Sequence, residues 1–479
     1  MENKFSKNVS LYTIGQFLAQ ALSFVLLPIY ISQLSIDEYG IVAVFMAVGT
    51  FLNALMQYGF SPTIMRYYFE FKKDSLKFKS FFSSLLLFLF GGNLIIVLLI
   101  YITHNFIYEF TLSSADVSTY IYYVIGYSFL YTFPLLNLSL FRVEGQAKKY
   151  FFFNLAQFFI SFGVIYYFVA IQQDGALGKI KGEFWARLPL FLLSFYLYRK
   201  YFTLKKLDFV YLKKALKFGV PLMFQALLWW SLYRLDYFLI EKELGSTALG
   251  LYNVAFQISF IVITLGIAYS LAWTPHFFSI AKEKSTPEIY GNLIGNFFMF
   301  LSIVSIGIYF MGYHVLELIG GEQYLVIFDF LPWLLIGAIF QSGYYLIHQT
   351  IQYSKKTWSI PAILGLGIFA GFTLEYLLIN KFELAGISII KVITFSAIFV
   401  LTYLKGQSYY KIKIPRSKII ITLIVLIVNF SIGYVLDFSA TSLFLKLFAF
   451  IITTFGLWFF FPFFSQAEKT TILKKLKRT

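Results

Sequence analysis

Apolar residues run along the chain in long blocks that are separated by short polar connections. An α-helix of about 20 residues, rising about 1.5 Å per residue, crosses a hydrocarbon core of about 30 Å. Fourteen blocks are long enough, and we therefore predict fourteen transmembrane helices. They cover residues 9–31, 39–64, 80–102, 118–140, 150–171, 175–198, 218–240, 248–275, 290–313, 325–349, 358–379, 384–404, 417–436 and 441–463.

The blocks show no alternation of apolar and polar residues with a period of two, which a membrane-spanning strand would need. Backbone groups in lipid must form hydrogen bonds within their own segment, so helices are expected throughout. Composition agrees, because 59% of the 479 residues are hydrophobic and 13% are charged, against about 45–50% and 25% in soluble domains. The predicted fold class is an all-α polytopic membrane protein.

Basic residues collect on one side of the predicted membrane. Of the 39 Lys and Arg residues, 31 lie in the N-terminus, the C-terminus and every second connection. Short loops rich in Lys and Arg stay in the cytoplasm, so we predict a multi-pass protein of the inner (plasma) membrane with both termini cytoplasmic. The net charge of +16 then indicates topology and attraction to anionic lipid, not nucleic-acid binding. The remaining basic residues are Lys179, Lys181, Lys242, Lys381, Arg187, Arg234, Lys391 and Lys446.

Nothing in the sequence indicates a cofactor. The chain has no cysteine, its four histidines lie far apart, and no GxxxxGK[ST] phosphate-binding loop is present. Thiolate metal sites and a self-contained ATP-driven pump are therefore excluded. We predict no metal, no cofactor and no enzymatic activity.

The sequence repeats itself weakly. QLSIDEYGIVAVF around Gly40 matches ELGSTALGLYNVAF around Gly250 at an offset of 210 residues, and a match of Gly178 to Gly386 has an offset of 208. Each half holds an even number of crossings, so the halves form a parallel repeat. The prediction is two six-helix bundles around a central cavity, 1–200 and 201–404, followed by two further helices and a basic tail, 405–479.

Two stretches resemble a known family. LKKALKFGVPLMFQALLWWSLYRLDYFLIEKELGSTALGLYNVAFQIS is similar to the start of the second half of bacterial polysaccharide transporters of the O-antigen flippase type, and IGQFLAQALSFVLLPIYISQLSIDEYGIVAVF is similar to their opening. That family belongs to the multidrug, oligosaccharidyl-lipid and polysaccharide exporter superfamily. The resemblance implies a flippase that moves a polyprenyl-diphosphate-linked oligosaccharide, an O-antigen or other surface polysaccharide repeat unit, from the inner to the outer leaflet. A polysaccharide polymerase and other assembly proteins are the expected protein partners.

Charges inside the predicted spans are candidates for the substrate site, because each costs about 3 kcal/mol in lipid unless it is paired or hydrated. Lys179, Glu183 and Arg187 stand at i, i+4 and i+8, on one face of one helix. This stripe should line a water-filled cavity or pair, and Glu183 can pair locally with Arg187. Alternatively, Lys179 and Lys181 lie in the outer connection and Arg187 extends its head to the membrane surface.

Lys391 occupies the position that the repeat equates with Glu183, and Glu375 in the preceding span reaches a similar depth. Lys391 can therefore form an ion pair with Glu375 or contact the substrate, and the sequence favours neither alternative. Arg234 and Asp236 point about 200° apart on a helix, so they need different partners. Arg234 either reaches the surface, or one of the two faces the groove between the halves; Lys446 is expected to reach the surface.

Arg and Lys supply charge-assisted donors to the oxygens of a diphosphate. The predicted substrate-binding residues are Arg187, Lys391, Arg234, Asp236, Lys179 and Glu183. A small-molecule exporter of the same superfamily should carry an acidic coupling residue within the first repeat, whereas the first predicted helix has no Asp or Glu and only Gln16 and Gln20 as candidate polar contacts. A polymerase or glycosyltransferase should have a large outer loop or a clustered set of catalytic groups, whereas the longest outer connection runs only over residues 104–117.

Overall fold

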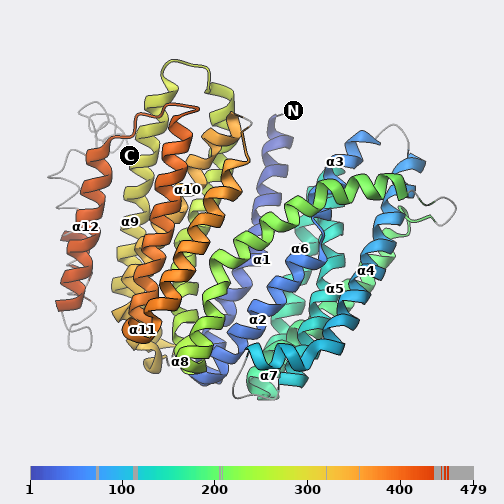
Figure 1. Cartoon of the computed structure of the whole chain (residues 1–479), viewed down its shortest axis with the longest axis horizontal. Helices are drawn as coiled ribbons and strands as arrows, with labels where there is room; N and C mark the ends of the chain where they lie inside the picture. The colour runs from blue at the N-terminus through green and yellow to red at the C-terminus, as the bar shows by residue number, and fades with distance from the viewer. Residues whose placement is uncertain are drawn as a thin grey trace. The chain divides into compact units, whose positions relative to one another are not determined.

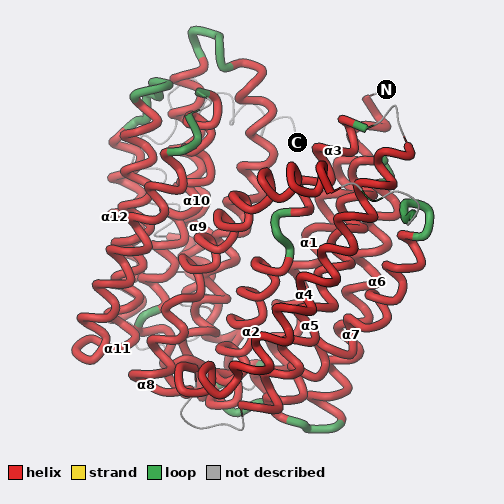
Figure 2. The backbone as a smooth tube through the Cα atoms, turned by 45° about the vertical axis from the view of Figure 1, so that its right-hand side comes forward, coloured by secondary structure: helices red, strands yellow, loops and turns green. Residues whose placement is uncertain are grey.

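The computed structural model describes residues 2–71, 75–111, 117–203, 207, 209–319, 321–354 and 356–435, with 444, 447, 448 and 450–452 near the C-terminus. Helices make up its regular structure, and no strand occurs in these ranges (Figure 2). The prediction of an all-α fold is confirmed. The elements are α1 (Glu2–Gln33), α2 (Ile36–Met56), α3 (Phe60–Glu70), α4 (Ser75–Thr111), α5 (Val117–Val143), α6 (Ala147–Tyr166), η1 (Tyr167–Ile171), α7 (Gly175–Tyr198), α8 (Phe209–Ile280), α9 (Thr286–Leu318), η2 (Glu322–Asp329), α10 (Leu331–Tyr353), α11 (Ser359–Gln407) and α12 (Arg416–Val435).

Most predicted spans have a helix at the predicted place. α7 begins and ends at the predicted residues, 175 and 198. By length and composition, 8 described helices can cross a membrane, or 9 if η2 and α10 form one broken span. The count of fourteen therefore stays a prediction, and its last span, 441–463, lies largely outside the described residues.

Two helices are too long for a single crossing. α8 has 72 residues and α11 has 49, or roughly 108 and 74 Å at about 1.5 Å per residue. α8 breaks at Gly245, where φ is 85° and ψ is 172°, and such backbone angles favour glycine. α11 breaks at Glu383, where φ is 46° and ψ is −140°. Each break falls between two predicted spans, so two crossings in each long helix stay the prediction.

The described fold divides into two units, Met1–Leu251 and Tyr252–Thr479. In the first unit α7 packs against α5 and α6, and α1 packs against α6. In the second, α9, α10, α11 and α12 run side by side (Figure 1). The predicted domain boundaries at 200/201 and 404/405 stay predictions.

Aromatic side chains fill the interior of the first unit at one end of α3, α4, α5 and α7. Phe60, Phe81 and Phe82 are fully buried there, and the Tyr198 hydroxyl donates to the backbone carbonyl of Phe133. Interfaces between apolar helices in lipid gain stability mainly from close packing and internal hydrogen bonds. This cluster therefore holds α7 in place beside α5.

Two stretches that the sequence repeat equates meet inside the first unit. A Cβ on Gly40 of α2 would lie 1.9 Å from the Ser246 carbonyl oxygen, and a Cβ on Gly250 of α8 would lie 2.1 Å from the Ile36 carbonyl oxygen. Ile36 and Gly40 correspond to Ser246 and Gly250 at the offset of 210 residues. The contact is therefore reciprocal, and each side needs a residue without a side chain.

Candidate functional site

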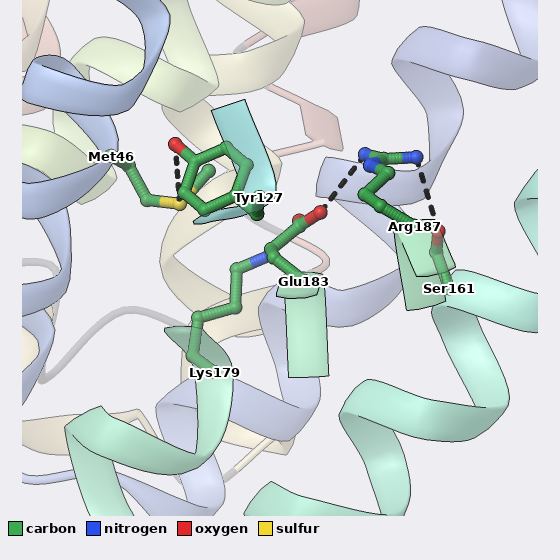
Figure 3. Close-up of polar contacts among 6 residues, drawn as sticks. All are labelled: Met46, Tyr127, Ser161, Lys179, Glu183 and Arg187. Carbon is green, nitrogen blue, oxygen red and sulfur yellow. Dashed lines mark hydrogen bonds and ion pairs between the residues drawn. The ribbon is translucent and has the colours of Figure 1, made fainter. Parts of the chain in front are cut away.

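The three charges on α7 form one buried ion cluster. Lys179 Nζ donates to Glu183 Oε1 at 2.5 Å, and Arg187 Nη2 donates to Glu183 Oε2 at 2.9 Å (Figure 3). The residues are 7%, 4% and 9% exposed, respectively. The helical spacing of four residues brings them together, so the predicted local pairing is confirmed. The alternative, in which Lys179 lies in the outer connection and Arg187 reaches the surface, is wrong because both side chains are buried in the helix bundle.

Neighbouring helices surround the cluster with aromatic and hydroxyl groups. The Tyr30 ring of α1 lies 5.5 Å from Lys179 Nζ, and the Tyr131 ring of α5 lies 4.6 Å from the Arg187 guanidinium. Arg187 Nη1 donates to Ser161 Oγ of α6 at 3.4 Å (Figure 3). Cation–π contacts of this kind stabilise a desolvated cation by roughly 1–2 kcal/mol. The sequence alone did not identify these partners, since they come from separate helices with no shared motif.

The cluster carries more positive than negative charge. Two cations share one carboxylate, which leaves a formal charge of +1, and Arg187 Nε is buried without a hydrogen-bond partner among the described residues. A buried donor without an acceptor costs about 1–3 kcal/mol. An anionic oxygen placed at Arg187 would both balance the excess positive charge and accept a hydrogen bond from Nε.

Lys391 and Glu375 form a second buried ion pair, in the second unit. Lys391 Nζ lies 3.4 Å from Glu375 Oε1, and the residues are 4% and 3% exposed. They stand on opposite sides of the break at Glu383, which turns α11 back on itself. A Cβ on Gly371 would lie 2.3 Å from Thr394 Oγ1, so the two parts of α11 pack closely. The predicted ion pair is confirmed.

Arg234 and Asp236 lie on different sides of α8, as their spacing requires. Asp236 is 1% exposed. Arg234 is half-buried, and its guanidinium lies 4.7 Å from the centre of the Tyr237 ring. The structure thus gathers Lys179, Glu183 and Arg187, whereas Arg234 and Asp236 belong to a different helix of the same unit.

Two features at the helix ends were not predicted. Glu241 is 2% exposed and accepts a hydrogen bond from Ser246 Oγ at 2.7 Å, next to the break at Gly245. At the other end of the first unit, Glu144 pairs with Lys200 at 3.0 Å and accepts from the Tyr201 hydroxyl. Burial, and then the Glu144 carboxylate, raise the pKa of Tyr201. That hydroxyl therefore stays protonated and can donate.

Some predicted features lie outside the described residues, namely Lys446 and the side chains of Gln16 and Gln20. Among the residues that the structure describes, no group of three His, Cys, Asp or Glu side chains could hold a metal ion. The candidate site on α7 therefore consists of the ion pairs of Glu183 with Lys179 and Arg187, surrounded by tyrosine rings.

Comparison with known sequences gives a family match. The model of the family described as "Polysaccharide biosynthesis protein" matches residues 33–329. An uncharacterized membrane protein of Haemophilus influenzae is 23% identical over 394 residues, which cover 76% of this chain and 88% of that protein. A protein of the Lsg locus of the same organism is 25% identical over 301 residues, 59% of this chain and 68% of that one.

Comparison with solved structures identifies the fold. The lipid II flippase MurJ, in its inward closed conformation, superposes with a TM-score of 0.72 at 14% identity and covers 93% of this chain and 97% of MurJ. An inward-facing multidrug resistance MATE family transporter of the MOP superfamily has a TM-score of 0.66 at 16% identity, over 81% and 94%. The chain therefore has a MurJ/MATE-like fold and is a multi-pass membrane protein.

Proposed function

The chain belongs to the family of polysaccharide biosynthesis proteins, and on this premise we propose that it is a flippase for a polyprenyl-diphosphate-linked oligosaccharide. The family connects it with surface polysaccharides, and the fold is shared with MurJ, which is named as a lipid II flippase. Both point to a carrier of a lipid-linked sugar rather than an enzyme. The proposed direction is from the inner to the outer leaflet, by alternating access.

The observation that carries this proposal is the excess positive charge in the Lys179–Glu183–Arg187 cluster, with the partnerless Nε of Arg187. Charge-assisted hydrogen bonds from a guanidinium to phosphate oxygens are short and directional. We propose that one diphosphate oxygen takes the place beside Arg187 as the bundle opens. Glu183 keeps the two cations oriented, and Lys179 balances that carboxylate.

The other candidate residues are assigned supporting roles. Arg234 is the half-buried cation of the set and therefore the one most open to an arriving headgroup. We propose that Asp236 helps to position α8, since it is buried on the other side of that helix from Arg234. Lys391, in the second unit, is proposed to leave Glu375 during transport and to donate to a phosphate oxygen of the substrate.

We also propose that the membrane potential helps to drive transport, because the diphosphate of the carried lipid is negatively charged. A diphosphate carries roughly two negative charges, and an inside-negative potential of about 100 mV favours their outward movement by about 4.6 kcal/mol. We place the protein in the inner membrane with both termini cytoplasmic, because its basic connections lie on one side. A polysaccharide polymerase on the outer face is the proposed recipient of the product.

The test is the location of lipid-linked repeat units in a strain that lacks this chain. We expect them to accumulate in the inner leaflet, and complementation to return them to the outer face. Accessibility to an added, membrane-impermeant glycosidase or lectin in spheroplasts measures the distribution between leaflets. Unchanged distribution in the deletion strain, with no second flippase gene expressed, would overturn the proposal.

A second candidate is an ion-coupled exporter of small molecules, favoured by the likeness to the multidrug MATE transporter. The same deletion strain separates the two functions. An exporter would change resistance to cationic compounds and leave the lipid-linked intermediates where they were.

A further inference from the structure

A cavity of about 450 Å³ lies within the second unit, and none of its lining residues belongs to an ion pair described above. It is bordered by η2, the first turns of α10, Tyr309 in the last third of α9 and the C-terminal half of α12. Sites for small ligands commonly enclose about 300–1,000 Å³. Its lining residues are Tyr309, Phe328, Asp329, Pro332, Trp333, Ile336, Ile427, Phe430, Ser431 and Tyr434.

Aromatic rings form most of the wall. The Tyr309 ring lies 5.8 Å from Phe328 and 5.1 Å from Phe430, measured between ring centres. Trp333 and Tyr434 are 40% and 76% exposed, so they stand where the cavity opens. Ring faces carry negative electrostatic potential and attract cations, above all organic ammonium groups.

One described lining residue is charged, and it is acidic. Asp329 is exposed at the end of η2 and faces a cavity that no described Lys or Arg borders. This is unusual in a chain with a net charge of +16. A carboxylate and several aromatic rings around one cavity both attract cations, and the rings also favour a ligand with an apolar part. An anionic headgroup would be repelled.

The exposed face of α12 indicates that the partner comes from the bilayer. Ile420, Ile424 and Ile427 stand at i, i+4 and i+7, which is one stripe along the helix. They are 56%, 45% and 58% exposed, and Ile427 also borders the cavity. An acyl chain lying on this stripe would leave its headgroup beside Asp329. A small soluble cation would use the cavity but not the stripe.

We propose that this cavity binds the ammonium headgroup of an ethanolamine phospholipid from the leaflet that borders η2. The ammonium group meets the Asp329 carboxylate and the ring faces of Trp333 and Tyr434, and one acyl chain follows the isoleucine stripe of α12. The cavity shares no residue with the proposed flippase site, and the proposal does not depend on what the protein transports.

Native mass spectrometry of the purified full chain provides the test. Delipidated protein is titrated with phosphatidylethanolamine or with phosphatidylglycerol of the same acyl chains, and the bound lipid is counted. We expect the wild type to retain phosphatidylethanolamine at least tenfold more strongly. Asp329→Asn should remove that preference, whereas Glu322→Gln, which removes an exposed carboxylate of η2 that does not line the cavity, should keep it.

Asp329 also precedes the first turn of α10, where a carboxylate stabilises the helix dipole, so Asp329→Asn can lower stability for another reason. Asp329→Glu keeps the charge and should keep the preference, and Trp333→Leu should reduce it several-fold. Equal retention of the two lipids by the wild type, as an annular lipid only, would overturn the proposal. An unchanged preference for phosphatidylethanolamine in Asp329→Asn would also overturn it. A third contrary result would be that dodecyltrimethylammonium displaces phosphatidylethanolamine equally well from the wild type and from Asp329→Asn.

Discussion

At the scale of single residues, Glu183 is the counter-charge of both cations in the α7 cluster. It pairs with Lys179 and Arg187 through separate carboxylate oxygens. Removing one partner of a buried ion pair typically costs about 3–5 kcal/mol, since the other charge is left without compensation. The cluster therefore contributes to folding as well as to the proposed recognition of a diphosphate, and mutations must separate the two.

The first prediction concerns the two cations that we assign to phosphate. The double variant Arg187→Gln and Lys391→Gln should insert into the membrane but deliver about 100-fold less glycan to the cell surface. Each lost charge-assisted hydrogen bond contributes about 1.5–3 kcal/mol. Surface glycan is quantified by lectin binding, and insertion by the amount of folded protein in detergent extracts.

A matched control replaces two exposed cations, Arg199→Gln and Lys405→Gln. Glycan delivery should then stay near the wild-type level. Normal delivery by a stably folded Arg187→Gln and Lys391→Gln protein would remove both residues from the substrate site.

The second prediction separates a structural ion pair from a substrate contact at Lys391. Glu375→Gln alone should lower the melting temperature strongly, because Lys391 is 4% exposed and would lose its counter-charge. The exchanged pair, Glu375→Lys with Lys391→Glu, should recover most of that stability but should not restore glycan delivery. Recovery of delivery by the exchanged pair would mean that Lys391 acts only through Glu375.

At the scale of secondary-structure elements, backbone packing between α2 and α8 depends on glycine. Gly40 and Gly250 each face a backbone carbonyl oxygen of the opposite helix at a distance that leaves no room for a Cβ. Because the two contacts correspond through the sequence repeat, they form one reciprocal joint. Close approach through small residues is a general means of packing helices in lipid.

The third prediction tests this joint. Gly40→Ala and Gly250→Ala should each destabilise the protein by about 1–3 kcal/mol through overpacking, measured as a lower thermal midpoint in detergent. The double variant should cost less than the sum, since either methyl group already separates the helices. Gly163→Ala serves as the control, because a Cβ there meets nothing within 4 Å; it should be neutral or slightly stabilising. An equal loss at Gly163 would contradict the packing argument.

At the scale of the whole molecule, the distribution of Lys and Arg predicts the topology. The breaks at Gly245 and Glu383 interrupt α8 and α11 between predicted spans, and the predicted topology therefore has two crossings in each of these helices. The predicted orientation assigns the connection around Gln172 to the outer side and the one around Lys356 to the cytoplasm.

The fourth prediction uses the absence of native cysteine in the sequence. A single cysteine at exposed Gln172 should react with a membrane-impermeant maleimide in intact spheroplasts. A single cysteine at exposed Lys356 should react only after permeabilisation. Labelling is read by mass shift of the purified protein, and the reverse pattern would invert the proposed orientation.

The sequence by itself determined that the protein lies in lipid and where most of its helices form. Long apolar blocks fixed where helices form, because lipid leaves no other partner for the backbone. The spacing of four residues fixed the Lys179–Glu183–Arg187 pairing, since it is a local property of one helix. The same locality made α7 predictable to its terminal residues.

Tertiary structure decided what depends on contacts between distant segments. It brought Tyr30, Tyr131 and Ser161 around the cluster, set Lys391 against Glu375, and placed Asp329 at a cavity lined by aromatic rings. Helix rotation and close approach are set by packing over many side chains, and no local pattern carries that information. For the same reason the sequence named the intramembrane charges, whereas only the fold showed which of them are buried together.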